Sequence, residues 1–163
     1  MKKVATALIM IILILGDQIF KILTLKYLKP LGSVNLIKGF LRLNYVENTG
    51  AAFGMFKNNT AVLSVFTGIV ILVCLYFIFL KPLDNRVYNV CLVMIVAGGI
   101  GNLIDRVFRS FVIDYIEALF VDFPVFNFAD ILVTCGSFIL AFYLIYETVK
   151  EKKNVKSGEE ADA

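Results

Sequence analysis

The chain has 163 residues, of which 60% are hydrophobic and 18% charged, with a formal charge of +3 and no histidine. An average soluble domain is about 45–50% apolar and about 25% charged, so this composition indicates a membrane protein, and the length allows a single domain. Without histidine there can be no Ser-His-Asp triad, Cys-His pair or H-E-x-x-H zinc site, and the dispersed lysines indicate no nucleic-acid partner.

Four apolar segments are long enough to cross a bilayer, which takes about 20 residues in a helix. They cover residues 4–28, 60–80, 87–104 and 131–146. The first segment follows two lysines like a signal peptide, but no A-x-A-like cleavage site follows it, so we expect it to remain as a span. The sequence thus predicts an all-α integral membrane protein, with one four-helix domain over residues 1–149.

The segments between the spans carry weaker patterns. Apolar side chains alternate with polar ones over residues 41–45, and with turn positions at Gly32 and Gly39 this predicts a small extracytoplasmic β element. Residues 108–120 suit either a short amphipathic helix in the membrane interface or a strand, and both remain open. The polar tail at 150–163 is predicted to be disordered and cytoplasmic.

Four spans place both termini on the same side of the membrane. The 16 lysines and arginines divide equally between the two sides, but those beside the termini lie in short segments. Because short loops weigh most in the positive-inside rule, we expect both termini in the cytoplasm. On that assignment the unusual polar side chains gather at the outer face. They are Asp17, Lys21, Asn48, Asp105, Asp114 and Asp130.

Charged side chains at membrane depth are costly and are therefore candidates for function. Asp17 and Lys21 are four residues apart and can form an ion pair on one helical face, which also suits a purely structural anchor. Asp105 is next to Arg106, which can neutralise it. Asp130 begins the last span, where a helix N-cap is the alternative to a functional role.

Five motifs occur in order along the chain. They are D-Q-I-F-K at 17–21, N-T-G-A-A-F at 48–53, G-G-I-G-N-L-I-D-R at 98–106, V-I-D-Y at 112–115 and F-P-V-F-N-F-A-D at 123–130. Together with the four spans, these motifs resemble the lipoprotein signal peptidases (signal peptidase II), a bacterial family of membrane aspartic proteases. The chain departs from the family pattern at Phe20, where a small hydroxyl residue is usual, and conservatively at Ile113 and Tyr115.

The resemblance implies that Asp114 and Asp130 are the catalytic pair of an aspartic endopeptidase. It implies substrate-binding roles for Asn48, Asn102, Arg106 and Asn127, and supporting roles for Asp17, Lys21, Gly50, Asp105 and Ala129. The expected substrates are prolipoproteins, cleaved just before a diacylglyceryl-modified cysteine at the extracytoplasmic face of the cytoplasmic membrane. Membrane lipids and globomycin-type inhibitors are further expected partners. We expect a monomer with neither a metal nor another cofactor.

Two carboxylates held close together share a proton, so one can activate water while the other protonates the leaving group. Asp105 competes for membership of this pair, but its neighbour Arg106 would keep it ionised. Two other functions remain as alternatives. A proton-coupled transporter would use Asp17, Asp105 and Asp130 as a relay, and it would favour an internal repeat that the sequence lacks. In a non-catalytic assembly factor, Asp114 would be replaceable without consequence.

Overall fold

The computed structural model describes residues 3–50, 59–81, 83 and 85–161. Four helical segments in these residues are long and apolar enough to cross a membrane, as the sequence predicts. They are Lys3–Leu31, Thr60–Leu80, Arg86–Arg109 and Phe128–Lys152. The first segment comprises α1 (Lys3–Leu23) followed by a π-helical turn and a 3₁₀ turn, and the second comprises α2 (Thr60–Leu75) followed by a π-helical turn. The third segment is α3 (Arg86–Arg109), and the fourth is most of α4 (Phe128–Ala161).

Helix α3 is the centre of the bundle. In the most apolar 18-residue stretch of α3, 50% is buried inside the protein. The corresponding buried share is 22% for the first span and 17% for the second and the fourth. It contacts α1, α2 and α4, and its buried face carries both apolar residues and the polar Asn102 and Asp105. The outer helices expose large apolar side chains such as Ile12 and Phe142, which suits contact with lipid. The polar residues of α3 therefore lie inside the bundle.

A three-stranded antiparallel sheet stands at one end of the bundle. Its order is β1 (Ser33–Ile37), β2 (Leu41–Asn48) and β3 (Val112–Ala118). The predicted hairpin is present, and Gly39 in its turn and Gly32 at its entry both have positive φ, near +73° and +72°. Glycine suits these positions because it has no Cβ to clash in the left-handed region.

In the segment at 108–120, which the sequence left open, the first two residues end α3 and Val112–Ala118 form strand β3. Its β-branched and aromatic residues fit a half-buried pleated surface, and it pairs with β2 so that Asn48 lies opposite Val112. Beyond the strand the chain returns, and Ile116 and Phe126 exchange backbone hydrogen bonds of 2.8 and 2.9 Å. These bonds bring the start of α4 back beside β3.

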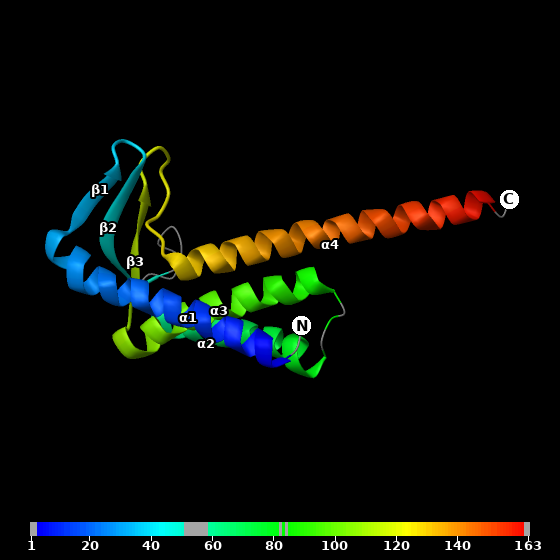
Figure 1. Cartoon of the computed structure of the whole chain (residues 1–163), viewed down its shortest axis with the longest axis horizontal. Coiled ribbons are helices and arrows are strands. Elements are labelled where there is room, and N and C mark those ends of the chain that lie inside the picture. The colour runs from blue at the N-terminus through cyan, green and yellow to red at the C-terminus, as the bar shows by residue number, and fades with distance from the viewer. Residues whose placement is uncertain (1–2, 51–58, 82, 84, 162–163) are drawn as a thin grey trace.

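Both termini lie at the end of the bundle opposite the sheet, and α4 extends well beyond the other helices (Figure 1). The helix continues to Ala161, so residues 150–161 of the tail that the sequence predicts to be disordered are helical, and the last two residues lie outside the described part of the chain. The tail is rich in lysine and glutamate, which are good helix formers and can extend a helix that the preceding span has already nucleated.

Candidate active site

Asp114 lies on β3, with only 1% of its surface exposed. Asn48, at the end of β2, donates its side-chain amide to Asp114 Oδ2 over 2.9 Å, and Asn127 donates to Oδ1 over 2.6 Å. Because Asn48 pairs with Val112, it reaches Asp114 as a diagonal neighbour across the two strands. The backbone N–H of Gly50 donates to Asn48 Oδ1 over 2.9 Å, which orients the amide nitrogen of Asn48 toward Asp114.

Asp130 lies in the first turn of α4. The backbone N–H of Asn127 donates to Asp130 Oδ2 over 3.0 Å, and the backbone N–H of Asp130 donates to Asn127 Oδ1 over 2.9 Å. This exchange is a capping box built from asparagine and aspartate. The other oxygen, Oδ1, accepts a 2.8 Å hydrogen bond from Asn102 on α3. The sequence suggested Asp130 itself as the N-cap, whereas Asn127 occupies that position and Asp130 is its partner three residues later, which holds the Asp130 carboxylate in one orientation.

Two asparagines connect the aspartates. Besides its bond to Asp114, Asn127 Nδ2 donates to Asn102 Oδ1 over 3.1 Å, so side-chain amides run without a break from Asp114 to Asp130. Both carboxylates line one cleft of about 350 Å³. The same cleft is lined by Asn48, Gly50, Arg106, Val112, Phe123, Pro124, Val125, Phe126, Ile131, Thr134 and Cys135. The structure thus brings two carboxylates together in a mostly apolar enclosure.

The environment of Asp114 favours its protonated form. Burial raises the pKa of Asp114 from 3.8 to about 7, and the nearby charge of Asp130 acts in the same direction. The hydrogen bonds from Asn48 and Asn127 oppose this rise because they stabilise the ionised carboxylate. Near neutral pH, Asp114 is therefore present in both protonation states, which suits a group that exchanges protons.

Arg106, near the C-terminal end of α3, supplies the positive charge of the cleft. Its guanidinium interacts electrostatically with Asp130 and Asp114. In the part of the chain that the structure describes, Arg106 Nε is the one buried side-chain polar atom without a hydrogen-bond partner. A buried donor without a partner costs free energy, and a ligand that accepts its hydrogen bond removes that cost.

Behind the cleft, Lys21 forms the centre of a buried charge cluster. Its Nζ lies 2.9 Å from Asp17 Oδ2 and 3.0 Å from Asp105 Oδ2, and all three side chains are at most 1% exposed. Lys21 also donates to Asn102 Oδ1 over 2.9 Å. The predicted pair of Asp17 and Lys21 is therefore confirmed, and it extends to a second carboxylate. Asp105 is paired with two cations, because Arg109 Nη1 lies 2.6 Å from its Oδ1.

The carboxylates of this cluster also hold the backbone beside the two aspartates of the cleft. Asp105 Oδ2 accepts a 3.1 Å hydrogen bond from the N–H of Ile113, the residue before Asp114. Asp17 Oδ1 accepts a 3.0 Å hydrogen bond from the N–H of Ala129, the residue before Asp130. Asp17 and Asp105 therefore fix the two backbone segments that present the cleft carboxylates.

A protein-family model described as "Signal peptidase (SPase) II" matches residues 9–146. The chain belongs to the signal peptidase II family. A lipoprotein signal peptidase from Caldanaerobacter subterraneus subsp. tengcongensis is 47% identical over 80% of this chain and 89% of its own. A lipoprotein signal peptidase from Clostridium tetani is 35% identical over 90% of this chain and 98% of its own.

Among solved structures, that of a bacterial membrane enzyme determined by the in meso method has a TM-score of 0.81 at 29% sequence identity. It covers 88% of this chain and 89% of that chain. A second bacterial membrane enzyme structure, also determined by the in meso method, has a TM-score of 0.76 at 30% sequence identity over 86% of this chain and 92% of its own. With the four apolar helices, these comparisons show a multi-pass bacterial membrane protein of a peptidase family.

The glycines of this signal peptidase II family member explain how α3 fits between its neighbours. A Cβ on Gly101 would lie 2.5 Å from Asp17 Oδ2, and one on Gly98 would collide with the carbonyl oxygen of Ala129. A Cβ on Gly99 would meet Ile71 of α2 at 3.2 Å. Close packing of helices in membranes depends on such small residues. The glycine motif therefore lets α1 and α4 approach α3 closely enough for the Lys21 cluster to form.

One expectation about the charges is confirmed only in part. The sequence suggested that Arg106 neutralises Asp105; the two side chains interact electrostatically, but the ion-pair partners of Asp105 are Lys21 and Arg109. On a helix, Arg109 is one turn beyond Asp105 and faces it, while an adjacent residue such as Arg106 points elsewhere. Asp105, which the sequence left as a competitor for the catalytic pair, is not among the described residues that line the cleft.

Two residues of the site were missed from the sequence. Arg109 could have been found from its i,i+4 spacing to Asp105, the rule that identified Asp17 and Lys21. Gln18, which donates to Asp17 Oδ2 and to the carbonyl of Gly101 at 3.1 Å each, left no comparable signal beyond its place in the first motif. The last residues of the N-T-G-A-A-F motif, 51–53, lie outside the described residues.

Proposed function

We propose that this chain is an aspartic endopeptidase that removes signal peptides from prolipoproteins, with Asp114 and Asp130 as its catalytic pair. The relatives named above are lipoprotein signal peptidases at 35–47% identity over most of the chain. The observation that carries the proposal is the unbroken connection from Asp114 through Asn127 and Asn102 to Asp130. A proton shared by two carboxylates needs them fixed relative to each other, which this connection achieves.

In the proposed reaction, one carboxylate is ionised and the other protonated. The raised pKa of Asp114 suits the protonated member, and in the proposed scheme Asp130 takes a proton from a water molecule whose oxygen attacks the scissile carbonyl carbon. Asp114 gives its proton to the carbonyl oxygen. When the tetrahedral intermediate collapses, the C–N bond breaks and the proton taken by Asp130 passes to the leaving amine. Asp114 takes back a proton from one hydroxyl of the intermediate as the new carboxyl group forms, which restores the starting state of the pair. This scheme uses the general acid and base roles of paired carboxylates.

The polar side chains around the pair have separate proposed roles. Asn48, Asn102 and Asn127 are substrate-binding candidates that also hold the carboxylates through the contacts described above. Arg106 is proposed to bind a backbone carbonyl of the substrate, because its buried Nε has no partner in the described structure. Asp17, Lys21, Gly50, Asp105 and Ala129 are proposed to support the site through their contacts with the residues that carry it.

A second hollow suggests how the substrate enters from the membrane. It lies between α2, α3 and α4 and shares Arg106, Asp130 and Thr134 with the catalytic cleft. Its other walls include Thr67 and Ile71 of α2. An apolar signal peptide lying in the bilayer could follow this hollow and present its cleavage site to the cleft, while the lipid-modified cysteine stays near the membrane surface.

We further propose that both termini are cytoplasmic and that the cleft opens at the extracytoplasmic face. The sheet lies at the end of the bundle opposite both termini (Figure 1), and the basic residues are densest in the short segments on the side of the termini. Globomycin-type inhibitors are proposed to occupy the cleft of a monomeric enzyme. The orientation is tested by introducing a cysteine at an exposed position, such as Lys38 on the hairpin, and treating intact cells with a membrane-impermeant thiol reagent. Reaction of this cysteine is expected if the hairpin lies outside the cell.

The proposed activity is tested with the purified full-length protein and two lipobox peptides. One peptide carries a diacylglyceryl group on its cysteine, and the other has the unmodified cysteine. We expect cleavage just before the modified cysteine and at least tenfold slower cleavage of the unmodified peptide. If neither peptide is cut while the folded protein transports protons, the transporter alternative is correct; if it does neither, an assembly role is favoured.

A further inference from the structure

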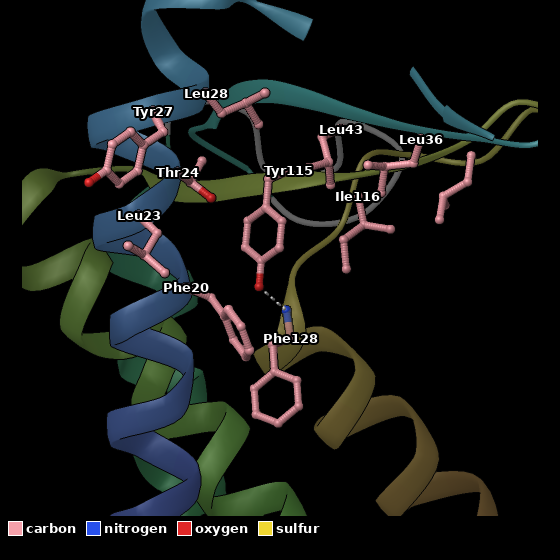
Figure 2. A pocket seen from close by; sticks show the side chains of 11 residues that line it. Phe20, Leu23, Thr24, Tyr27, Leu28, Leu36, Leu43, Tyr115, Ile116 and Phe128 are labelled. Atoms are coloured by element: carbon pink, nitrogen blue, oxygen red, sulfur yellow. Dashed lines mark hydrogen bonds between the residues drawn. The ribbon is translucent and has the colours of Figure 1, made fainter. Parts of the chain in front are cut away.

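A large apolar groove lies beneath the sheet, apart from the catalytic cleft (Figure 2). Its volume is about 720 Å³, roughly twice that of the cleft. The end of the first span, all three strands and the first residue of α4 contribute to its walls, and the only side-chain polar groups are the hydroxyls of Thr24, Tyr27 and Tyr115. A space of this size and character suits a hydrocarbon chain.

Among the residues that the structure describes, none lines both the groove and the cleft. Consecutive residues of β3 point to opposite faces, so Asp114 lines the cleft while Tyr115 lines the groove. The N–H of Phe128 donates to the hydroxyl of Tyr115 over 3.3 Å, and the ring of Phe128 packs edge-on against Phe20 at 5.7 Å. These contacts form part of the wall between the groove and the catalytic residues.

The groove opens at the side of the bundle that faces lipid. Phe20 and Leu23 line it and are still 48% and 44% exposed. Ile19 and Ile22, on the same stretch of α1, are more than half exposed. Because the first span crosses the membrane, these side chains face acyl chains. An acyl chain can therefore enter the groove sideways from the bilayer, without passing through the cleft.

A positive charge lies beside this groove. Lys26 is exposed, and its Nζ lies 5.1 Å from the ring centroid of Tyr27, which is a lining residue. Lys29 and Arg42 are also near the sheet, but each is paired with a glutamate. Among the residues described, Lys26 has no carboxylate within ion-pair distance, so its charge remains available for a phosphate. Lysines and tyrosines at a membrane surface commonly interact with lipid headgroups.

We propose that this groove binds an anionic glycerophospholipid, with an acyl chain between the sheet and α1 and the phosphate beside Lys26. The charge beside an otherwise apolar groove favours a phospholipid over a neutral lipid chain. The bound chain would pack against Tyr115 and Phe128, which stand next to Asp114 and two residues before Asp130. The lipid would therefore support the strand and helix end that carry the two aspartates.

The test uses the full-length protein in phosphatidylcholine vesicles that contain a small fraction of phosphatidylglycerol with a photoreactive diazirine on one acyl chain. After illumination, labelled peptides are identified by mass spectrometry. We expect labelling concentrated on groove residues such as Leu23, Leu43 and Ile116. Lys26→Gln should reduce this labelling at least threefold, while Lys38→Gln, at another exposed lysine of the same end, should leave it unchanged.

Further comparisons separate this lipid from other occupants. Leu23→Trp, which narrows the groove, should reduce labelling, whereas Leu8→Trp on the exposed face of the same helix should not. Three results would each overturn the proposal: labelling spread evenly over the exposed faces of all spans, equal labelling by a phosphatidylcholine probe, or loss of labelling with one equivalent of a diacylglyceryl peptide. The last result would assign the groove to the substrate. Labelling does not require peptidase activity, so the outcome is independent of the proposed function.

Discussion

Asp17 Oδ1 accepts a 3.0 Å hydrogen bond from the backbone N–H of Ala129, which follows it by 112 positions in the chain. Asp105 makes the equivalent contact with the N–H of Ile113. Each contact holds the residue that precedes one aspartate of the proposed catalytic pair. The buried charges around Lys21 thus link three separate helices and a strand at the point where the two carboxylates must be aligned.

Replacing Lys21 with methionine should destabilise the protein strongly. The change leaves Asp17 and Asp105 buried without the cation between them, and breaking such a pair costs about 3–5 kcal/mol. The thermal unfolding midpoint in detergent measures this effect. Lys29→Met is the matched control, because its pair with Glu47 is exposed and screened by water. Equal midpoints for the two variants would contradict the role given to Lys21.

Gly101→Ala should disturb the same cluster from the α3 side. The added methyl would lie 2.5 Å from Asp17 Oδ2, and overpacking of this kind costs about 1–3 kcal/mol. We expect a lower unfolding midpoint and slower peptide cleavage. Gly16→Ala is the control, because a Cβ there meets nothing within 4 Å, and alanine in a helix should stabilise it by about 1 kcal/mol. The explanation fails if both variants behave alike.

The pKa of Asp114 predicts two effects of pH. Because Asp114 acts as the protonated member and its pKa is about 7, cleavage should fall to half near pH 7 and continue to decline above it. Folding stability should respond in the same direction. The folded protein keeps this proton between pH 3.8 and about 7 while the unfolded chain loses it, so stability falls as pH rises through that window.

The variant Asp114→Asn isolates this titration. It lacks the ionisable group, so its unfolding midpoint should improve relative to wild type between pH 5 and pH 8. Measuring both proteins at the two pH values tests the prediction. A constant difference between them would show that Asp114 has an ordinary pKa in the folded protein.

Arg106→Lys should weaken substrate binding. Lysine keeps the positive charge but loses the guanidinium Nε that is buried without a partner in the described structure. A hydrogen bond to a charged group contributes about 1.5–3 kcal/mol, which corresponds to a roughly 10–100-fold loss in kcat/KM, mainly through KM. Arg86→Lys, at the exposed other end of α3, should leave the kinetics unchanged. An unaltered KM in Arg106→Lys would exclude the proposed contact.

Local spacing in the sequence predicted the features that depend on one helix or one strand. The pair of Asp17 and Lys21 follows from the pitch of a helix, and the hairpin follows from alternation and two glycines. Strand β3 could not be distinguished from an amphipathic helix, because its pattern suits both, and its pairing with β2 decides between them. That pairing joins segments separated by a whole pair of spans.

In the candidate site too, the sequence predicted the local features but not the contacts between distant segments. The motifs identified Asp114, Asp130 and the asparagines, but the hydrogen bonds that connect them depend on how β3 and α4 meet. The direct ion pair of Asp105 with Arg109 was missed in favour of Arg106 because adjacency in sequence does not give adjacency on a helix. The helical tail was missed because its polar composition suggests disorder, although its individual residues favour a helix.

The central claim is that Asp114 and Asp130 form the catalytic pair. Its most direct test is the cleavage rate of a diacylglyceryl-modified lipobox peptide by Asp114→Asn and Asp130→Asn, each checked for folding by its unfolding midpoint. Asp122→Asn, at an exposed aspartate of the segment before α4, is the control. We predict that both cleft variants lose at least a thousandfold in rate while the control keeps the wild-type rate. Wild-type turnover by either folded cleft variant would contradict the claim.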